Sequence, residues 1–205
     1  MPIFFQHSIS DFTRLGIWKI EESEEFFKEK VPQHRDVTHP HKRLQHLAGR
    51  FLLPFLFPEF PQHLVRIADT RKPFLPGDPF HFSISHCGDY AAAIVSHRHR
   101  VGIDIEIPVQ RILRIKDKFL NETEKGNWAD ESTMPDHQLL TLLWSCKESV
   151  FKWFGNGGVD FSSHILLSDP GNGTESFKCL FTKIPQALTV NYRKFDQVIL
   201  TWVES

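Results

Sequence analysis

Cysteine is scarce in this chain, and long apolar runs are absent. The three cysteines, Cys87, Cys146 and Cys179, lie far apart and form no CxxC pair. This spacing argues against a disulfide framework or a zinc site and favours a reducing compartment. No apolar stretch approaches the roughly 20 residues that a membrane-spanning helix requires, and the first ten residues lack the basic start and apolar core of a signal peptide. We therefore expect a soluble, cytoplasmic protein without a membrane partner.

Neither sign of charge dominates the sequence. The chain has 24 basic and 25 acidic side chains among 205 residues, for a net charge of −1. This balance excludes a broad attraction to nucleic acid, so any cationic site must be local. Tyrosine and methionine are also rare, with two of each, whereas there are 19 phenylalanines. We expect a core built largely on phenyl rings, in one large domain or two small packed ones.

Hydrophobic periodicity predicts an α+β fold. A strand is expected at 15–20, a short helix at 23–29, and an amphipathic helix that begins after an N-cap at Thr38 and ends at Pro54. The later part of the chain predicts a helix marked by Ile112, Ile115 and Phe119, and a long helix from about His137 to Phe154. Further strands, separated by glycine and proline turns, are expected at 81–85, 90–96, 101–107, 164–167, 175–181, 187–192 and 197–203.

Two acids share one predicted strand. Asp104 and Glu106 alternate with Ile103 and Ile105, so both carboxylates point to the same face. Two neighbouring carboxylates repel each other unless a cation lies between them, and oxygen ligands suit Mg²⁺. The alternative is an exposed strand face with two solvated acids. In either case we expect exposed carboxylates that contribute little to stability.

A second candidate pair lies on the long helix. Glu148 and Lys152 are four residues apart, which places them on one helix face. The simple interpretation is a surface ion pair of small energy. The functional interpretation makes Glu148 a third metal ligand and Lys152 a phosphate contact, which together complete a magnesium–diphosphate site.

A third group of residues precedes the acids. Lys72 comes before Pro73 in a stiff turn, and a later strand ends in Ser85-His86 before Gly88. A cationic side chain and turn N–H groups can bind a phosphate. Ser85-His86 also suggests a hydrolase, but no GxSxG motif surrounds the serine, and neighbouring strand residues point to opposite faces.

These segments together resemble the Sfp-type 4′-phosphopantetheinyl transferases. The motifs KPF, FSISHCGDY, GIDIE, KFLNETE and WSCKESVFKWFG occur in the order and approximate spacing of that family, between about Leu15 and Phe161. The resemblance implies a monomer of two similar α+β halves packed as a pseudo-dimer, residues 1–97 and 98–205, with coenzyme A bound between them. It implies transfer of 4′-phosphopantetheine to a serine of an apo acyl or peptidyl carrier protein, with release of 3′,5′-ADP.

The resemblance also assigns roles to residues. Asp104, Glu106 and Glu148 match the family's Mg²⁺-binding acids, and Asp104, Glu148 and Lys152 are the expected catalytic group. The expected coenzyme-binding residues are Arg43, Lys72, Pro73, Ser85, His86 and Lys152. Among them, Arg43 resembles the arginine that binds the 3′-phosphate. Phe119-Leu120 resembles a segment near the carrier protein, where exposed apolar residues would suit docking of a helical acidic partner.

Two other functions use part of the same residues. A magnesium-dependent phosphohydrolase shares the acids, but the sequence lacks the further HD or DxD ligands expected of one. A non-catalytic module that binds coenzyme A or a carrier protein would keep Arg43, Lys72 and His86 but lose one of the metal acids. All three acids are present, which favours the transferase.

Overall fold

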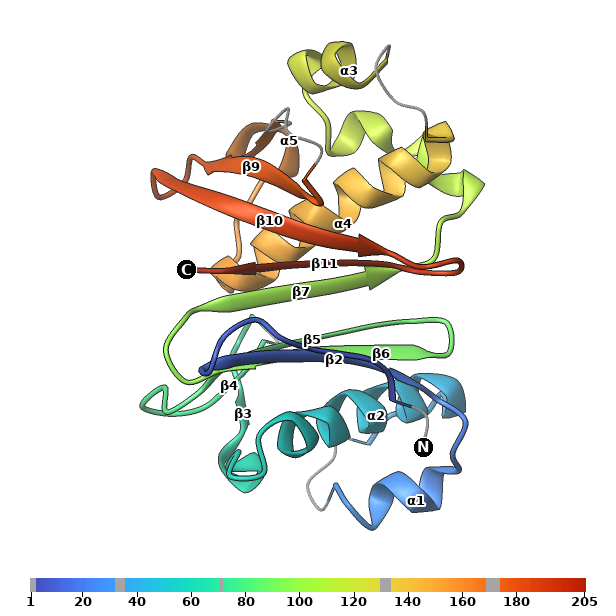
Figure 1. The fold of residues 1–205 in the computed structure, drawn as a ribbon, viewed down its shortest axis with the longest axis vertical. Coiled ribbons are helices and arrows are strands. Elements are labelled where there is room, and N and C mark those ends of the chain that lie inside the picture. Colours follow the sequence, from blue (N-terminus) through green and yellow to red (C-terminus); the bar gives the residue numbers. More distant parts are fainter. Residues whose placement is uncertain (1–2, 32–35, 71, 130–133, 169–173) are drawn as a thin grey trace.

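The chain forms two main sheets in which all neighbouring strands are antiparallel (Figure 1). A computed structural model describes residues 3–31, 36–70, 72–129, 134–168 and 174–205. The first sheet has the order β1-β2-β6-β5 and contains β1 (Ile3–Ser8), β2 (Thr13–Lys19), β5 (His81–Cys87) and β6 (Tyr90–Ser96). The second has the order β7-β11-β10-β9-β8 and contains β7 (Val101–Glu106), β8 (Ile165–Ser168), β9 (Ser176–Phe181), β10 (Gln186–Lys194) and β11 (Ile199–Glu204). A two-stranded hairpin joins β3 (Arg66–Ile67) to β4 (Pro73–Phe74).

Helices cover the outer faces of both sheets. The helices are α1 (Glu24–Lys28), α2 (Pro40–Leu56), α3 (Glu122–Ala129), α4 (Asp136–Phe154) and α5 (Phe161–His164), with short 3₁₀ turns η1 (Gln62–Leu64), η2 (Gln110–Arg114) and η3 (Lys116–Lys118). Figure 1 shows α2 below the first sheet and α4 above the second, which gives the layer order helix, sheet, sheet, helix. Within the described ranges, no helix combines the length and apolarity needed to cross a membrane.

Three apolar clusters fill the spaces between these layers. The cluster between α2 and the first sheet is rich in phenyl rings, as the composition predicts, and buries Phe27, Phe57, Phe60, Phe80 and Phe82. A second cluster lies between α4 and the second sheet. The third lies between the two sheets and takes side chains from both.

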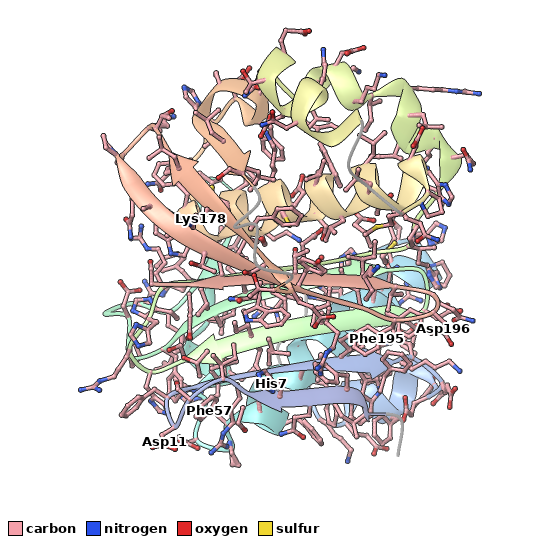
Figure 2. All side chains as sticks on the ribbon, turned by 45° about the horizontal axis from the view of Figure 1, so that its top comes forward. His7, Asp11, Phe57, Lys178, Phe195 and Asp196 are labelled. Atoms are coloured by element: carbon pink, nitrogen blue, oxygen red, sulfur yellow. The ribbon has the colours of Figure 1, made fainter. Side chains whose placement is uncertain are left out.

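The turn after β10 extends the contact between the sheets. Phe195, labelled in Figure 2, lies in this turn. Its ring centroid is 5.1 Å from that of Phe4 and 5.2 Å from that of Phe5, both on β1. Edge-to-face packing of this kind adds to the energy of area burial. The N-terminal strand is therefore held against the second sheet as well as its own.

Strand β7 and helix α4 touch through a glycine. A Cβ atom at Gly102 would lie 2.0 Å from the carbonyl oxygen of Ser149 and 2.6 Å from the backbone nitrogen of Trp153. Any larger residue would push the strand and the helix apart. This contact brings the strand that carries Asp104 close to the helix that carries Glu148.

Two serine hydroxyls join β5 to β7 across the boundary between the sheets. Ser83 Oγ accepts from the Ile103 amide and Ser85 Oγ from the Ile105 amide, each at 3.3 Å. These bonds satisfy backbone N–H groups along the unpaired edge of β7. The SxS pattern of β5 therefore has a structural purpose.

The structure confirms most of the predicted elements and corrects two. The Ser23 cap and the long helix that ends at Phe154 are present. Helix α2 is capped by His39 instead of Thr38, and it continues past Pro54 to Leu56. The stretch from Ile112 to Phe119 forms 3₁₀ turns instead of an α-helix.

The expectation of an apolar docking segment at Phe119-Leu120 is wrong. Phe119 is 0% exposed and Leu120 is 3% exposed, because both pack into the cluster beneath α4. Trp144 stacks edge to face on Phe119 at 5.3 Å. These two side chains therefore offer no surface to a partner.

Candidate active site

Asp104 is the centre of the candidate site. The residue is only 3% exposed. Its Oδ1 accepts from Ser85 Oγ at 2.8 Å and from Lys152 Nζ at 2.7 Å, and its Oδ2 accepts from Ser145 Oγ at 2.8 Å. The expectation of an exposed acid is wrong for Asp104, because three donors from β5 and α4 replace the lost water.

The other two predicted acids lie beside Asp104 and feel its charge. Burial, and then repulsion from Asp104, raises the pKa of Glu106. The same two causes, in the same order, raise the pKa of Glu148 to about 7, and Lys152 opposes the shift. Both glutamates are half-buried. The group therefore carries negative charge that one lysine does not fully offset.

Lys152 is the cation nearest to this cluster. Its ammonium group bonds to Asp104 and to Ser85 Oγ, the latter at 2.8 Å. The side chain remains 25% exposed. Lys152 therefore faces the acids on one side and solvent on the other.

A cavity of about 800 Å³ opens next to Lys152. Its walls come from α2, the β3–β4 hairpin, β5 and the end of α4, and they include Lys72, Pro73, His86 and Lys152. The family resemblance predicts that these four residues bind coenzyme. The structure thus brings four of the six predicted coenzyme-binding residues to one cavity. Ser85 lies directly behind it, bonded to Lys152.

Arg43 does not line this cavity. Its guanidinium pairs with Glu24 at 2.8 Å and donates to the carbonyl oxygens of Val37 and Thr38. The Arg43 guanidinium, and then Lys28, lowers the pKa of Glu24 to about 2. In this conformation Arg43 ties α2 to α1. The prediction that it binds a 3′-phosphate stays a prediction.

Arg50 is a candidate site residue that the sequence motifs did not indicate. It lines the cavity and is 8% exposed. Burial lowers the pKa of Arg50. Among the described residues it has no hydrogen-bond or ion-pair partner. A buried guanidinium without an anion is suited to bind one from solution.

Lys72 is another basic residue that lines the cavity. Its Nζ donates to the carbonyl oxygen of Lys152 at 2.7 Å. Burial, and then repulsion from Arg100, lowers the pKa of Lys72 to about 8. A lysine at the last turn of a helix satisfies carbonyl groups that lack partners. Lys72 therefore links the β3–β4 hairpin to the end of α4.

A buried ion pair supports α4 from behind the acids. Lys147 is 0% exposed and Glu124 is 2% exposed. Lys147 Nζ contacts Glu124 Oε2 at 2.7 Å, the Phe161 carbonyl at 2.9 Å and the Ile165 carbonyl at 2.7 Å. This pair joins α3, α4 and β8. No local sequence pattern indicates this pair, because its two members lie 23 residues apart.

The three carboxylates make an oxygen donor set that fits Mg²⁺. Burial, and then repulsion from Asp104, raises the pKa values of Glu106 and Glu148, and a cation bound beside them would favour their charged forms. Among the described residues, no three acidic, histidine or cysteine groups are already arranged around a common metal position.

Comparison with known proteins identifies a family for this sequence. The model of the 4′-phosphopantetheinyl transferase superfamily matches residues 100–203, a range that contains the three acids and Lys152. Enterobactin synthase component D of Escherichia coli (strain K12) is 35% identical over 127 residues, which cover 60% of each chain. The component D of Salmonella austin is 34% identical over 115 residues, 56% of this chain and 49% of that protein.

A third relative has a name that states an activity. The 4′-phosphopantetheinyl transferase of Bacillus subtilis is 36% identical over 112 residues, 52% of this chain and 48% of that protein. The matches thus span about half to three fifths of the curated relatives. The superfamily match, in contrast, covers just over half of this sequence and includes the whole acidic cluster. The chain therefore belongs to the 4′-phosphopantetheinyl transferase superfamily.

Proposed function

We propose that this protein transfers the 4′-phosphopantetheine group of coenzyme A to a serine of an apo acyl or peptidyl carrier protein and releases 3′,5′-ADP. The observation that carries this proposal is the cavity lined by Lys72, His86 and Arg50, which opens beside Lys152 and the acids. A volume of about 800 Å³ suits a small-molecule ligand. Its cationic lining suits a ligand with several phosphates.

Asp104 and Glu106 would hold the Mg²⁺ ion, and Glu148, the third acid that the family resemblance assigns to the metal, lies beside them. When bound, the ion neutralises the diphosphate and so stabilises charge that redistributes during transfer. The chain's own residues supply the rest. Lys152 binds a diphosphate oxygen, and His86 and Arg50 hold phosphates away from the bond that breaks. This positioning directs the reacting phosphorus toward the carrier serine.

The proposed reaction is a single displacement at phosphorus. The serine oxygen forms a bond to one phosphorus of the diphosphate, and the bond to the bridging oxygen breaks, so that 3′,5′-ADP leaves. The serine proton passes to the Glu148 carboxylate. A base whose pKa is raised to about 7 suits proton transfer at neutral pH. Glu148 cannot act as a free base and a tight metal ligand together, so we assign it the base role in the transfer step.

We also propose that residues 1–97 and 98–205 are two similar α+β halves of one functional monomer, packed as a pseudo-dimer. The support is that each range contributes an antiparallel sheet covered by one long helix, α2 or α4. The boundary falls in the link between β6 and β7. The three cysteines are free thiols, which supports a location in the reducing cytoplasm.

The carrier protein docks, in this proposal, on the segment after β7 instead of on Phe119-Leu120. Val109 and Leu113 are each 38% exposed, and Arg111 and Arg114 are exposed beside them. A second cavity, of about 470 Å³, connects this segment to Glu106. Apolar and basic side chains together suit an acidic helical partner.

Mass spectrometry of an apo carrier protein, incubated with this protein, coenzyme A and Mg²⁺, tests the proposal. We expect the carrier serine to gain phosphopantetheine while 3′,5′-ADP appears, and we expect no gain with chelator. Hydrolysis of coenzyme A without carrier modification would indicate the phosphohydrolase. Binding of coenzyme A or carrier without any turnover would indicate the non-catalytic module. Asp104→Asn is the matched control, because it removes the central carboxylate and keeps the side-chain shape.

A further inference from the structure

The turn that follows His86 is contacted from two sides. Cys87 pairs with Tyr90, so only Gly88 and Asp89 form the loop between β5 and β6. Gly88 has a φ of +53°, and a Cβ atom there would lie 2.6 Å from Ile107 Cδ1. Positive φ and this contact both favour glycine. The β7 end of the second sheet therefore limits the turn from one side.

Helix α2 fixes the same turn from the other side. Gln45 Nε2 donates to the Gly88 carbonyl oxygen at 2.8 Å, and His41 Nε2 lies 3.0 Å from that oxygen. The two side chains are one helical turn apart on a common face. A carbonyl oxygen accepts two hydrogen bonds, so both donors can bind it when His41 carries its proton on Nε2.

A second contact between α2 and β5 lies one turn further along the helix. A Cβ atom at Gly49 would lie 2.6 Å from Ile84 Cγ2, so helix and strand approach closely there. Ser85 and His86 lie between this contact and the bonds to Gly88. The segment that carries both predicted coenzyme-binding residues is thus fastened to α2 at each end.

We infer that Gln45, supported by His41, is a positioning residue that presents His86 to the phosphates of the coenzyme by holding the Gly88 carbonyl. Gln45 does not line the cavity, so it acts through the turn and not on the ligand. The inference rests on the proposed coenzyme-binding role of His86. It adds a residue to which the family resemblance gave no role.

Gln45→Leu tests this role, since leucine keeps most of the volume and lacks the donor. We expect the dissociation constant for coenzyme A, measured by calorimetry without carrier protein, to rise about 2- to 12-fold. The KM for coenzyme A should rise by the same factor, while kcat at saturating coenzyme stays within about twofold, because the affected contact is equal in ground and transition states.

Gln62→Leu is the matched control. Gln62 is 8% exposed and Gln45 is 7% exposed, but the Gln62 amide nitrogen has no hydrogen-bond partner among the described residues. We expect Gln62→Leu to leave both the dissociation constant and the KM unchanged. Equal behaviour of the two variants, or a fall in kcat for Gln45→Leu that matches the rise in KM, overturns the inference.

His41→Ala provides a second route. The His41 side chain is 44% exposed, so its loss keeps the fold. If Gln45→Leu does not fold, the inference depends on this variant alone, for which we expect at least a twofold weaker affinity. In the double variant Gln45→Leu/His41→Ala, the dissociation constant should rise by more than the product of the two single-variant factors. The reason is that in each single variant the remaining donor still binds the Gly88 carbonyl. Since calorimetry needs no turnover, weaker binding in a protein that transfers nothing would reject the proposed function and keep the inference.

Discussion

Replacing Lys147 by methionine should cost about 3–5 kcal/mol of unfolding free energy. Methionine matches the length of lysine but leaves the Glu124 carboxylate without its cation at 2% exposure. Breaking one half of a buried pair has this cost because a buried charge stays uncompensated. The carbonyls of Phe161 and Ile165 also lose their donor.

The loss is large enough to measure in two ways. In a chain of this size, each kcal/mol shifts Tm by about 2–4 °C, so we expect a decrease of roughly 6–20 °C. Urea unfolding followed by circular dichroism gives the free energy directly, and the slope with denaturant should not change. Burial already lowers the pKa of Lys147, and its bond to Glu124 opposes that shift. The charged form of Lys147 is therefore destabilised by burial and stabilised by Glu124.

Two further variants decide whether the buried pair is the cause. Lys125→Met makes the same change at a partly exposed lysine that pairs with Asp117 and Glu122, and it should cost less than about 1 kcal/mol. Lys147→Met combined with Glu124→Gln should recover part of the loss, since the amide oxygen can still accept from the backbone. If Lys147→Met costs no more than Lys125→Met, or if the double variant is no more stable than the single one, this reasoning is wrong.

Three shorter predictions concern the site. Glu148→Gln should lower kcat about 10²- to 10⁴-fold in the carrier assay and leave the calorimetric affinity for coenzyme A unchanged; an unchanged kcat rejects the base role. Arg50→Met should weaken coenzyme A binding about 10- to 150-fold, since a charge-assisted contact is lost. The affinities of Arg50→Met and Arg43→Met should be compared for coenzyme A and for dephospho-coenzyme A, which lacks the 3′-phosphate. The arginine that binds the 3′-phosphate is the one whose loss weakens binding of coenzyme A but not of dephospho-coenzyme A. Burial raises the pKa of Cys87 from 9.0 to about 11, so at pH 8 iodoacetamide should label it about 100-fold more slowly than in the unfolded chain, as mass spectrometry can show; equal rates contradict the burial argument.

Local patterns were enough to predict the parts that repeat along the chain. Strand alternation placed Asp104 and Glu106 on one face, and the period of the long helix placed Glu148 and Lys152 on another. Both patterns depend only on backbone geometry. Two elements lacked a pattern: β1 is an edge strand with mostly exposed side chains, and α3 is polar throughout its described side chains.

Burial of the polar residues could not be predicted in the same way. Asp104 looks like a solvated acid in the sequence, and its three donors come from β5 and two turns of α4. Lys147 looks like a helix surface residue, yet Glu124 and two carbonyls enclose it. Partners separated by 14 to 48 residues leave no local signal. Only the packing of layers brings them together.

Gly102 sets the separation between the acid of the strand and the acid of the helix. The backbone of β7 contacts the backbone of α4 at Gly102, where a Cβ atom would not fit. The distance from Asp104 to Glu148 therefore depends on the absence of a side chain at this position. An alanine at this position would move the two carboxylates apart without touching either one. Under the proposed function, such a change would weaken Mg²⁺ binding through a residue that has no ligand atom of its own. The glycine of the GIDIE motif is in this sense a spacer, and its tolerance to substitution measures how exact the geometry of the acids must be.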